Sequence, residues 1–256
     1  MPEGIIEERE IQKAMVVVAH ADDAEFGCSG TVAKWCSQDV EVVYVLCTDG
    51  SKGTENREIS SAQLAEIRRN EQLGAAEVLG LKDVVFLGYP DAYLEPTLEL
   101  RRDITREIRR HKPEVVICMY PSRNLDGGRW GVGHPDHIAS GEAALSAIFP
   151  AARDHLTFPE LLKEGLETHK VAEAWIMGHP EPDHWVDVTD HVDTAIAALV
   201  RHSSQLTGRD LDAIRDSMRK SRRERSVGKG MQYGESFRKI SFQTIGRSTP
   251  PSATKP

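Results

Sequence analysis

Four short apolar runs, separated by segments with helical spacing, constrain the fold of this chain more than any other feature. The runs span residues 14–19, 40–47, 84–87 and 115–119. Each has the length of a strand and is apolar on both faces, as in a parallel sheet that is covered on both sides. Segments of helical character lie between the runs, at residues 30–37, 61–79 and 98–111. This alternation predicts an α/β fold, a doubly wound and mostly parallel sheet with helices on both faces.

Several helix boundaries are marked by residues with known end preferences. The helical segment over residues 61–79 follows Ser60 or Ser61 as N-cap and ends at Gly80, a typical C-terminal stop. The next helix must end before Pro113, which cannot continue it. In the C-terminal half we expect helices at residues 139–149, 190–202 and 211–225, and short strands at residues 173–177 and 185–188.

Length and charge limit the kinds of protein that this chain can be. Its 256 residues suffice for one α/β domain with a substantial core, although two small domains would also fit. We expect a single domain over residues 1–247 and a disordered tail, rich in Ser, Thr and Pro, over residues 248–256. The formal net charge of -8 argues against a nucleic-acid partner, because phosphate contacts need clustered Lys and Arg. Small metabolites are the more natural partners.

The sequence carries no sign of a membrane or an oxidising compartment. No apolar stretch approaches the roughly 18 residues needed to cross a bilayer. The acidic N-terminal segment lacks the basic-then-apolar order of a signal peptide. The four cysteines form no C-x-x-C pair and do not resemble a disulfide framework. We therefore expect a cytoplasmic protein without a membrane partner.

Polar residues follow each of the four predicted parallel strands. They lie at residues 20–23 (HADD), 48–50 (TDG) and 88–91 (GYPD), and from Pro121 onward. In doubly wound folds, ligands bind beyond the carboxyl ends of the strands. The polar segments are therefore expected to gather on one rim of the sheet, where a functional site would lie.

Two of these segments carry residues of the types that bind zinc. His20, Asp23 and His137 supply the usual nitrogen and oxygen ligands, and three protein ligands leave the open position typical of a catalytic zinc. Adjacent aspartates cannot face the same way, so Asp22 would stay free to act as general base. His134, three residues before His137, would stand beside the metal as acid or oxyanion partner. Taken singly, each of these residues could instead be an ordinary loop or helix-capping residue.

At these residues the sequence resembles the LmbE-like or PIG-L family of zinc N-deacetylases, which have a Rossmann-like fold. The first family motif, A-H-P-D-D with a following Glu, corresponds to residues 19–25 (AHADDAE). The second, H-P-D-H, corresponds to residues 134–137. Ala21 stands where the family usually has proline, which would stiffen this turn but contributes no chemistry. Further similarity lies at residues 48–54, 68–71, 74–76 and 86–91.

The resemblance implies the same roles for the five residues of the candidate site. It also implies substrate-binding roles for Arg68 and Asp91, which could otherwise be a surface charge on a helix and a turn residue. Similarity to the diacetylchitobiose and bacillithiol-pathway deacetylases implies a substrate that contains N-acetylglucosamine. The family further implies a homo-oligomer.

These observations together predict a zinc-dependent hydrolase that removes the acetyl group from the amide nitrogen of a small N-acetylated amino sugar. One alternative is an amidase that acts on a larger thiol-sugar conjugate. Another is a non-catalytic Rossmann-like module that binds a nucleotide or a methyl donor, although the glycine fingerprint of such modules is missing. Iron, cobalt or manganese could occupy the same ligands as zinc.

Four further features of the sequence are interpreted separately. Cys28 is expected to be buried rather than to bind the metal. The loop over residues 121–133 is either a wall of the pocket or an ordinary surface loop. The basic stretch over residues 215–229 is interpreted as a solvated helix face or a subunit contact rich in ion pairs. No role follows for three histidines late in the chain: His179, His184 and His191.

Overall fold

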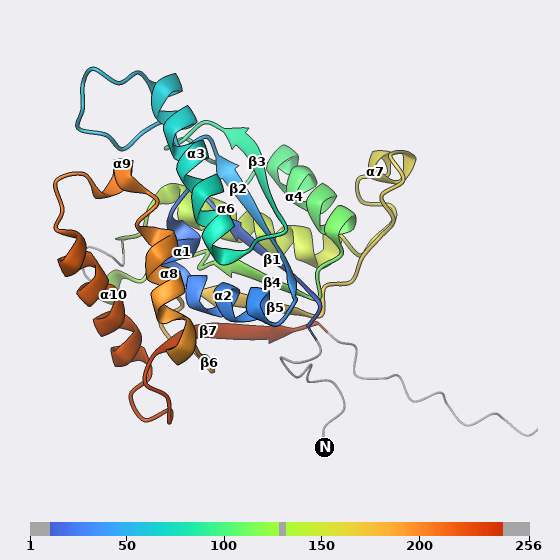
Figure 1. Ribbon diagram of the computed structural model, residues 1–256. Coiled ribbons are helices and arrows are strands. Elements are labelled where there is room, and N and C mark those ends of the chain that lie inside the picture. The colour runs from blue at the N-terminus through green and yellow to red at the C-terminus, as the bar shows by residue number, and fades with distance from the viewer. Residues whose placement is uncertain (1–10, 128–131, 243–256) are drawn as a thin grey trace, which may run out of the picture.

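The computed structural model describes residues 11–127 and 132–242 (Figure 1). Its centre is a seven-stranded sheet with the order β3-β2-β1-β4-β5-β7-β6. The predicted domain boundary at residue 247 and the tail over residues 248–256 lie outside the described residues. The strands are β1 Lys13–Val18, β2 Glu41–Thr48, β3 Asp83–Tyr89, β4 Val115–Met119, β5 Glu173–Met177, β6 His184–Asp187 and β7 Gly234–Ser241.

Five neighbouring strands are parallel, which confirms the predicted α/β class. β1 pairs with β2 on one side and with β4 on the other, with Val16 opposite Tyr44 and Ile117. β3 and β5 extend the parallel sheet at its two ends. β7 runs antiparallel between β5 and β6 and was not among the predicted strands. The charged residues of β7 interrupt the apolar pattern that predicts a strand. One of them, Glu235, is buried as an ion-pair partner.

The longer helices largely match the predicted segments. Ser60 caps α3 in a capping box with Gln63, and Gly80 ends the helix in the left-handed conformation. α6 begins four residues before the predicted segment. The helix predicted over residues 190–202 is shorter in the structure, where a 3-10 turn at Thr189–His191 leads into α8 and α8 ends at Leu199. The helices are α1 Asp23–Gly27, α2 Ser29–Ser37, α3 Ser61–Leu79, α4 Leu98–His111, α6 Pro135–Ser146, α7 Glu160–Lys163, α8 Val192–Leu199, α9 Ser203–Leu206 and α10 Leu211–Arg225.

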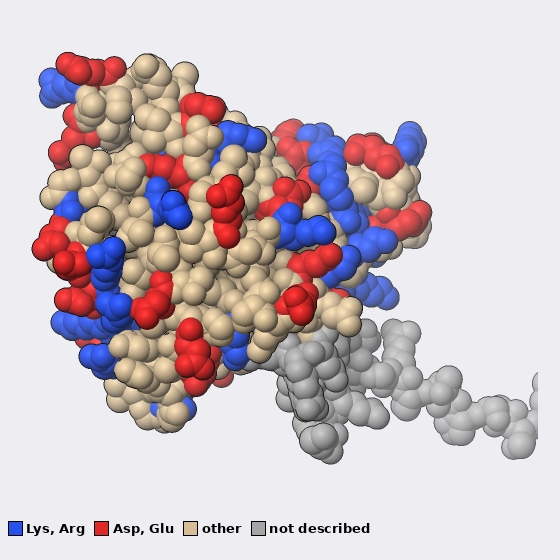
Figure 2. Space-filling view, viewed as in Figure 1, with Lys and Arg blue, Asp and Glu red and all other residues tan. Residues whose placement is uncertain are grey.

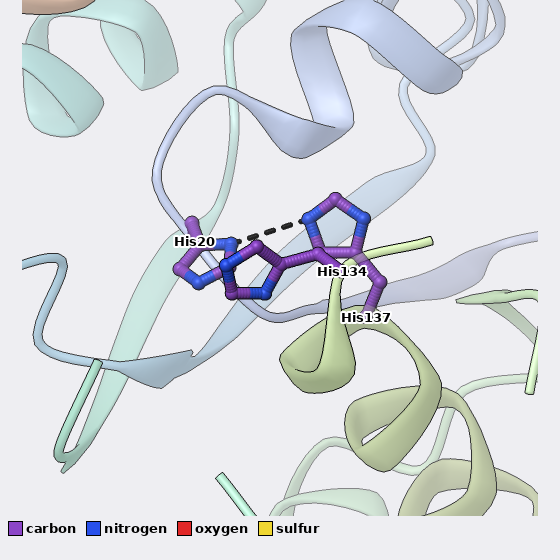
Figure 3. Close-up of side chains that lie close together, drawn as sticks. All are labelled: His20, His134 and His137. Atoms are coloured by element: carbon purple, nitrogen blue, oxygen red, sulfur yellow. Dashed lines mark hydrogen bonds between the residues drawn. The ribbon is translucent and has the colours of Figure 1, made fainter. Parts of the chain in front are cut away.

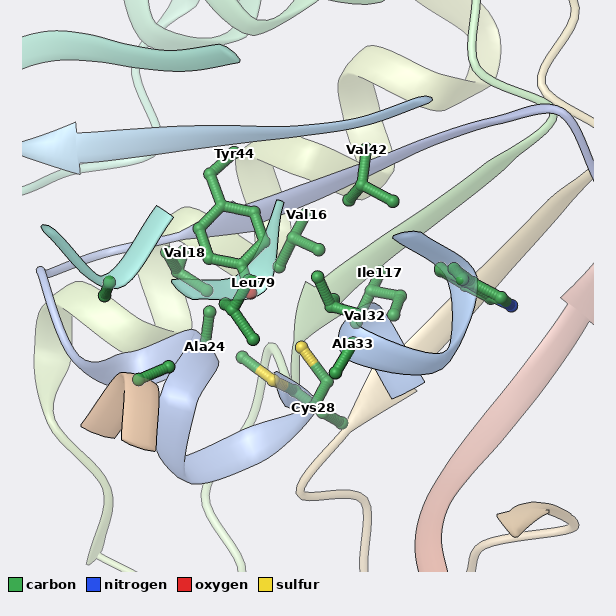
Figure 4. Close-up of a cluster of buried hydrophobic side chains, with 14 of the residues drawn as sticks. Val16, Val18, Ala24, Cys28, Val32, Ala33, Val42, Tyr44, Leu79 and Ile117 are labelled. Carbon is green, nitrogen blue, oxygen red and sulfur yellow. The ribbon is translucent and has the colours of Figure 1, made fainter. Parts of the chain in front are cut away.

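Alternating side chains of the strands form one apolar core on each face of the sheet. In β1, Val16 and Val18 join the core under α2, α3 and α8, which Figure 4 shows in part. Met15 and Val17 point the other way, into the core under α4 and α6. This period of two is the strand geometry expected for a sheet covered on both faces.

The strand order reverses between β1 and β4, where the chain connections diverge to opposite faces of the sheet. The loop after β1 leads into α1, and the segment after β4 leads into α6. α6 packs closely on the end of β4, because a Cβ at Gly141 would collide with the carbonyl of Met119. This contact holds the first turn of α6 beside the end of β1. Among the described residues, no helix is both long and apolar enough to cross a membrane.

Candidate metal centre

The loop after β1 places two carboxylates in different directions. Asp22 adopts a positive φ of 92°, a left-handed conformation that costs a non-glycine residue on the order of 1–3 kcal/mol. The next residue, Asp23, begins α1 and accepts a hydrogen bond from the backbone N–H of His20 at 2.8 Å. Backbone strain of this kind is concentrated at functional sites, where the surrounding structure maintains it.

The first turn of α6 brings two histidines to the same place. His134 is the N-cap, and Pro135 at the next position is favoured there because its missing N–H needs no partner. His137 follows within the first turn of the helix. Figure 3 shows the rings of His134 and His137 beside the ring of His20, which comes from the loop after β1. One nitrogen of each ring lies within 4.8 Å of the other two.

The three predicted metal ligands lie within contact distance of one another. His20 Nδ1 is 3.3 Å from His137 Nε2 and 3.4 Å from Asp23 Oδ2. His137 Nε2 is 3.1 Å from Asp23 Oδ1. Two ligands that each lie about 2.0–2.1 Å from one tetrahedral zinc are separated by about 3.3 Å. The spacing of these donor atoms therefore fits a single zinc ion.

The opposite nitrogen of His20 faces two further carboxylates. Its Nε2 lies 3.0 Å from Asp136 Oδ2 and 3.1 Å from Asp91 Oδ1. A histidine that binds a metal commonly donates its other N–H to a carboxylate, which fixes the ring and its tautomer. His20, Asp91 and Asp136 also form a compact group of ligand-type residues. Asp136 was not among the predicted site residues, and its place between the two histidines was the only available signal.

Electrostatics around His20 favour a bound cation. Burial alone would lower the pKa of His20, but hydrogen bonds with its carboxylate neighbours outweigh this effect and raise the pKa to about 11. Burial likewise opposes ionisation of Asp23, yet the two histidines beside it hold its pKa well below the usual range. The buried site thus carries a concentration of negative charge, which a divalent metal would neutralise.

Asp22 lies beside this centre and does not share its ligand contacts. Burial and the charge of Asp23 raise the pKa of Asp22 to about 7, against the opposing charge of Arg68. Its Oδ1 is 3.7 Å from Arg68 Nη2. A general base works best with a pKa near the working pH, so Asp22 has the properties that this role requires.

His134 is the most accessible of the three histidines, with 42% of its side chain exposed. Its Nδ1 accepts the backbone N–H of Asp136 at 3.2 Å. Because Nδ1 is an acceptor, the proton of the neutral ring is on Nε2, which is therefore a hydrogen-bond donor. Burial and the neighbouring His20 and His137 lower the pKa of His134, which favours this neutral form.

Arg68 and Asp91, the predicted substrate-binding residues, lie at the buried edge of the same site. They are only 5% and 3% exposed. Arg68 Nη1 is 3.7 Å from Asp91 Oδ2, and the guanidinium also donates hydrogen bonds to the carbonyls of Ala21, Gly50 and Lys52. Much of the hydrogen-bonding capacity of Arg68 is therefore used within the protein.

The segment after β4 contributes a wall to an open pocket beside α6. Pro121 to Arg123 face Pro135 and Ile138 across this pocket, and Leu94 and Glu142 complete part of its lining. Among the described residues, the lining of this pocket includes none of the three candidate metal ligands. Residues 128–131 of the loop lie outside the described part of the chain.

The remaining features have contacts of their own. Cys28 is fully buried in an apolar core, as expected (Figure 4). His179 packs against Tyr120, and His184 packs against Trp175. His191 ends a short 3-10 turn before α8.

The basic stretch forms most of α10, and its exposed residues are interspersed with acidic ones. Arg215 pairs with Asp212, and Arg219 pairs with Asp193. Figure 2 shows a similar mixture of basic and acidic side chains over the visible face. Arg222 departs from the predicted solvated face: it is 1% exposed and is bonded to a buried Glu235 at 2.8 Å.

The sequence of this chain matches a known family over the segment that holds the site. Residues 15–148, just over half of the 256 residues, match the model described as PIG-L: GlcNAc-PI de-N-acetylase. The chain therefore belongs to the PIG-L family, as the resemblance in its motifs implied. The matched segment includes all seven residues of the predicted site.

Named relatives of this chain are deacetylases of N-acetylglucosamine-containing compounds. Diacetylchitobiose deacetylase of Thermococcus kodakarensis is 31% identical over 77% of this chain and 71% of the relative. A probable N-acetyl-α-D-glucosaminyl L-malate deacetylase of Bacillus anthracis is 30% identical over 75% of this chain and 80% of the relative. The solved N,N'-diacetylchitobiose deacetylase of Pyrococcus horikoshii superposes with a TM-score of 0.83, at 28% identity, over 94% of this chain and 89% of that chain.

Proposed function

We propose that this protein is a zinc-dependent N-deacetylase that removes acetyl from a small amino sugar containing N-acetylglucosamine. The observation that carries the proposal is the spacing of the donor atoms of His20, Asp23 and His137, which lie 3.1–3.4 Å apart. Family membership and the activities of the named relatives support the same reaction class. Three protein ligands would leave a coordination position open for reaction.

In the proposed reaction, the residues beside the ligands carry out the proton transfers. When bound, the zinc ion would polarise the acyl carbonyl and make a water molecule more acidic. Asp22 takes the proton of this water as the oxygen attacks the acyl carbon. His134 donates its Nε2–H to the developing oxyanion and assists the departure of the amine. The proton held by Asp22 passes to the amine nitrogen as the C–N bond breaks, and acetate and the free amino sugar are released.

Arg68 and Asp91 belong to the proposal as the residues that recognise sugar hydroxyls. Support comes from their place beside Asp22 at the inner edge of the site. Arg68 Nε is buried without a hydrogen-bond partner among the described residues. Because both side chains are nearly buried, a sugar would contact them only at the floor of the site. Assembly into a homo-oligomer and a cytoplasmic location remain predictions.

The test is acetate release by purified protein from N-acetylglucosamine and diacetylchitobiose, before and after chelation, with zinc added back. Release that chelation abolishes and zinc restores is the expected result. No release with one metal bound per chain would direct the search to larger amides, including the thiol-sugar conjugate. No release and no bound metal would overturn the proposal and favour a non-catalytic module.

The general base is tested by Asp22→Asn. We expect zinc to remain bound while kcat falls by about 10²–10⁴, the usual contribution of a positioned base. Asp39→Asn is a matched control, because Asp39 is also an aspartate with positive φ, at 64°, but is exposed. Near-normal activity of Asp22→Asn would refute the role of Asp22.

A further inference from the structure

Helix α3 holds both sides of the peptide group that joins Ala21 to Asp22. Arg68 Nη2 donates to the carbonyl oxygen of Ala21 at 2.7 Å. The N–H of the same peptide group, on Asp22, donates to Gln72 Oε1 at 3.4 Å. Arg68 and Gln72 are four residues apart and therefore lie on one face of the helix. Together they restrict rotation of the peptide plane immediately before Asp22.

The neighbours of Gln72 determine which way its amide points. Gln72 Nε2 donates to Glu25 Oε1 at 3.1 Å, so the NH₂ end of the amide is directed at Glu25. The amide oxygen must therefore face the N–H of Asp22. Glu25 Oε2 lies 3.3 Å from His202 Nε2, so the carboxylate is held from its other side as well. Gln72, Glu25 and His202 are all fully buried, which makes this arrangement costly to rearrange.

The backbone conformation of the loop at this peptide group must be held by other contacts. Asp22 is held at a φ of 92°, a value that is uncommon for a residue other than glycine. The preceding residue is Ala21, whereas the resembling motif has proline, whose ring would remove one soft torsion from the turn. In this chain the restraint must therefore come from contacts outside the loop. Arg68 and Gln72 make such contacts at the correct position.

We propose that Gln72 is a positioning residue, which holds the loop between the metal ligands His20 and Asp23 so that the Asp22 carboxylate stays directed for proton removal. Gln72 acts on the reaction only through Asp22. Its predicted effect on rate rests on the proposed deacetylase function, whereas its effect on the order of the loop does not.

The first test is Gln72→Met, which keeps the length of the side chain and removes both hydrogen bonds. We expect kcat to fall by about 10–100-fold with KM within twofold, because small displacements of a catalytic group cost rate rather than binding. Zinc stoichiometry should be unchanged. Hydrogen–deuterium exchange at the Asp22 amide should accelerate in metal-free and zinc-loaded protein alike. Glu77→Gln, an exposed change of similar size on α3, is the control and should alter none of these quantities.

A second test asks whether proline can replace the restraint. Added to Gln72→Met, Ala21→Pro should recover a substantial part of the lost kcat, measured against Ala21→Pro alone. If Gln72→Met does not fold, Gln72→Asn serves instead, because its shorter amide cannot reach both Glu25 and the Asp22 N–H.

Three results would overturn the proposal: kcat within twofold of the parent, loss of zinc in proportion to activity, or unchanged exchange at Asp22. If the parent protein itself releases no acetate, the deacetylase function fails, and the exchange measurement still decides whether Gln72 restrains the loop.

Discussion

Replacing Asp136 with asparagine tests whether the metal site depends on residues behind its ligands. Asp136 is fully buried, and its Oδ2 accepts from the Ala92 N–H at 2.7 Å and lies 3.0 Å from His20 Nε2. Its Oδ1 accepts from the Leu94 N–H at 3.2 Å. Asparagine has nearly the same shape but only one acceptor oxygen. Its NH₂ group must therefore face one of the donors that the carboxylate of Asp136 accepts in the parent protein.

The expected magnitude follows from these contacts. Loss of a carboxylate that orients a metal-binding histidine typically weakens metal affinity by about 10–100-fold. This corresponds to about 1.4–2.7 kcal/mol in the free energy of zinc binding. A buried donor left without an acceptor would also lower the free energy of unfolding of the metal-free protein by about 1–3 kcal/mol.

The assay is competition for zinc between the protein and a chromophoric chelator, at constant pH and salt. Glu142→Gln, an exposed change on the same helix, is the control and should leave the affinity unchanged. A folded Asp136→Asn protein that binds zinc within threefold of the parent would refute the reasoning. His20 would then be positioned by other contacts, of which Asp91 is the nearest.

Three further predictions follow from the site and its support. Zinc binding at pH 8 should release a proton, because the raised pKa of about 11 keeps His20 protonated in metal-free protein and a ligand nitrogen must be free of its proton. The affinity for zinc should thus rise by about tenfold per pH unit. If calorimetry in two buffers shows no proton release on zinc binding, the prediction is wrong. His134→Ala should lower kcat by about 10²–10³ with zinc retained; parallel loss of zinc and activity would make His134 a ligand instead. Glu235→Leu should lower the free energy of unfolding by about 3–5 kcal/mol, since it leaves Arg222 buried without its partner. Urea denaturation that shows a loss under 1 kcal/mol would exclude this role.

The local pattern of the sequence was sufficient to predict the parallel part of the sheet. Strands buried on both faces appear as continuous apolar runs, and residues such as Ser60 and Gly80 mark helix ends by local hydrogen bonding and backbone conformation. β7 was missed because its buried Glu235 looks, in sequence, like a residue exposed to solvent. Only the contacts of Glu235 with Arg222 and with the backbone N–H groups of Gly30 and Thr31 explain its burial.

By itself, the sequence determined the class of fold, the rim on which the site lies and the chemical types of the candidate ligands. These properties depend on periodicity and on residue identity within short segments. The tertiary structure decided which residues support the site, because those contacts join distant segments. Asp136 meets His20 across 116 positions, and Gln72 meets the Asp22 peptide across 50 positions. Neither contact has a local signal, since hydrogen bonding between side chains depends on the packing of α3 and α6 around the end of β1.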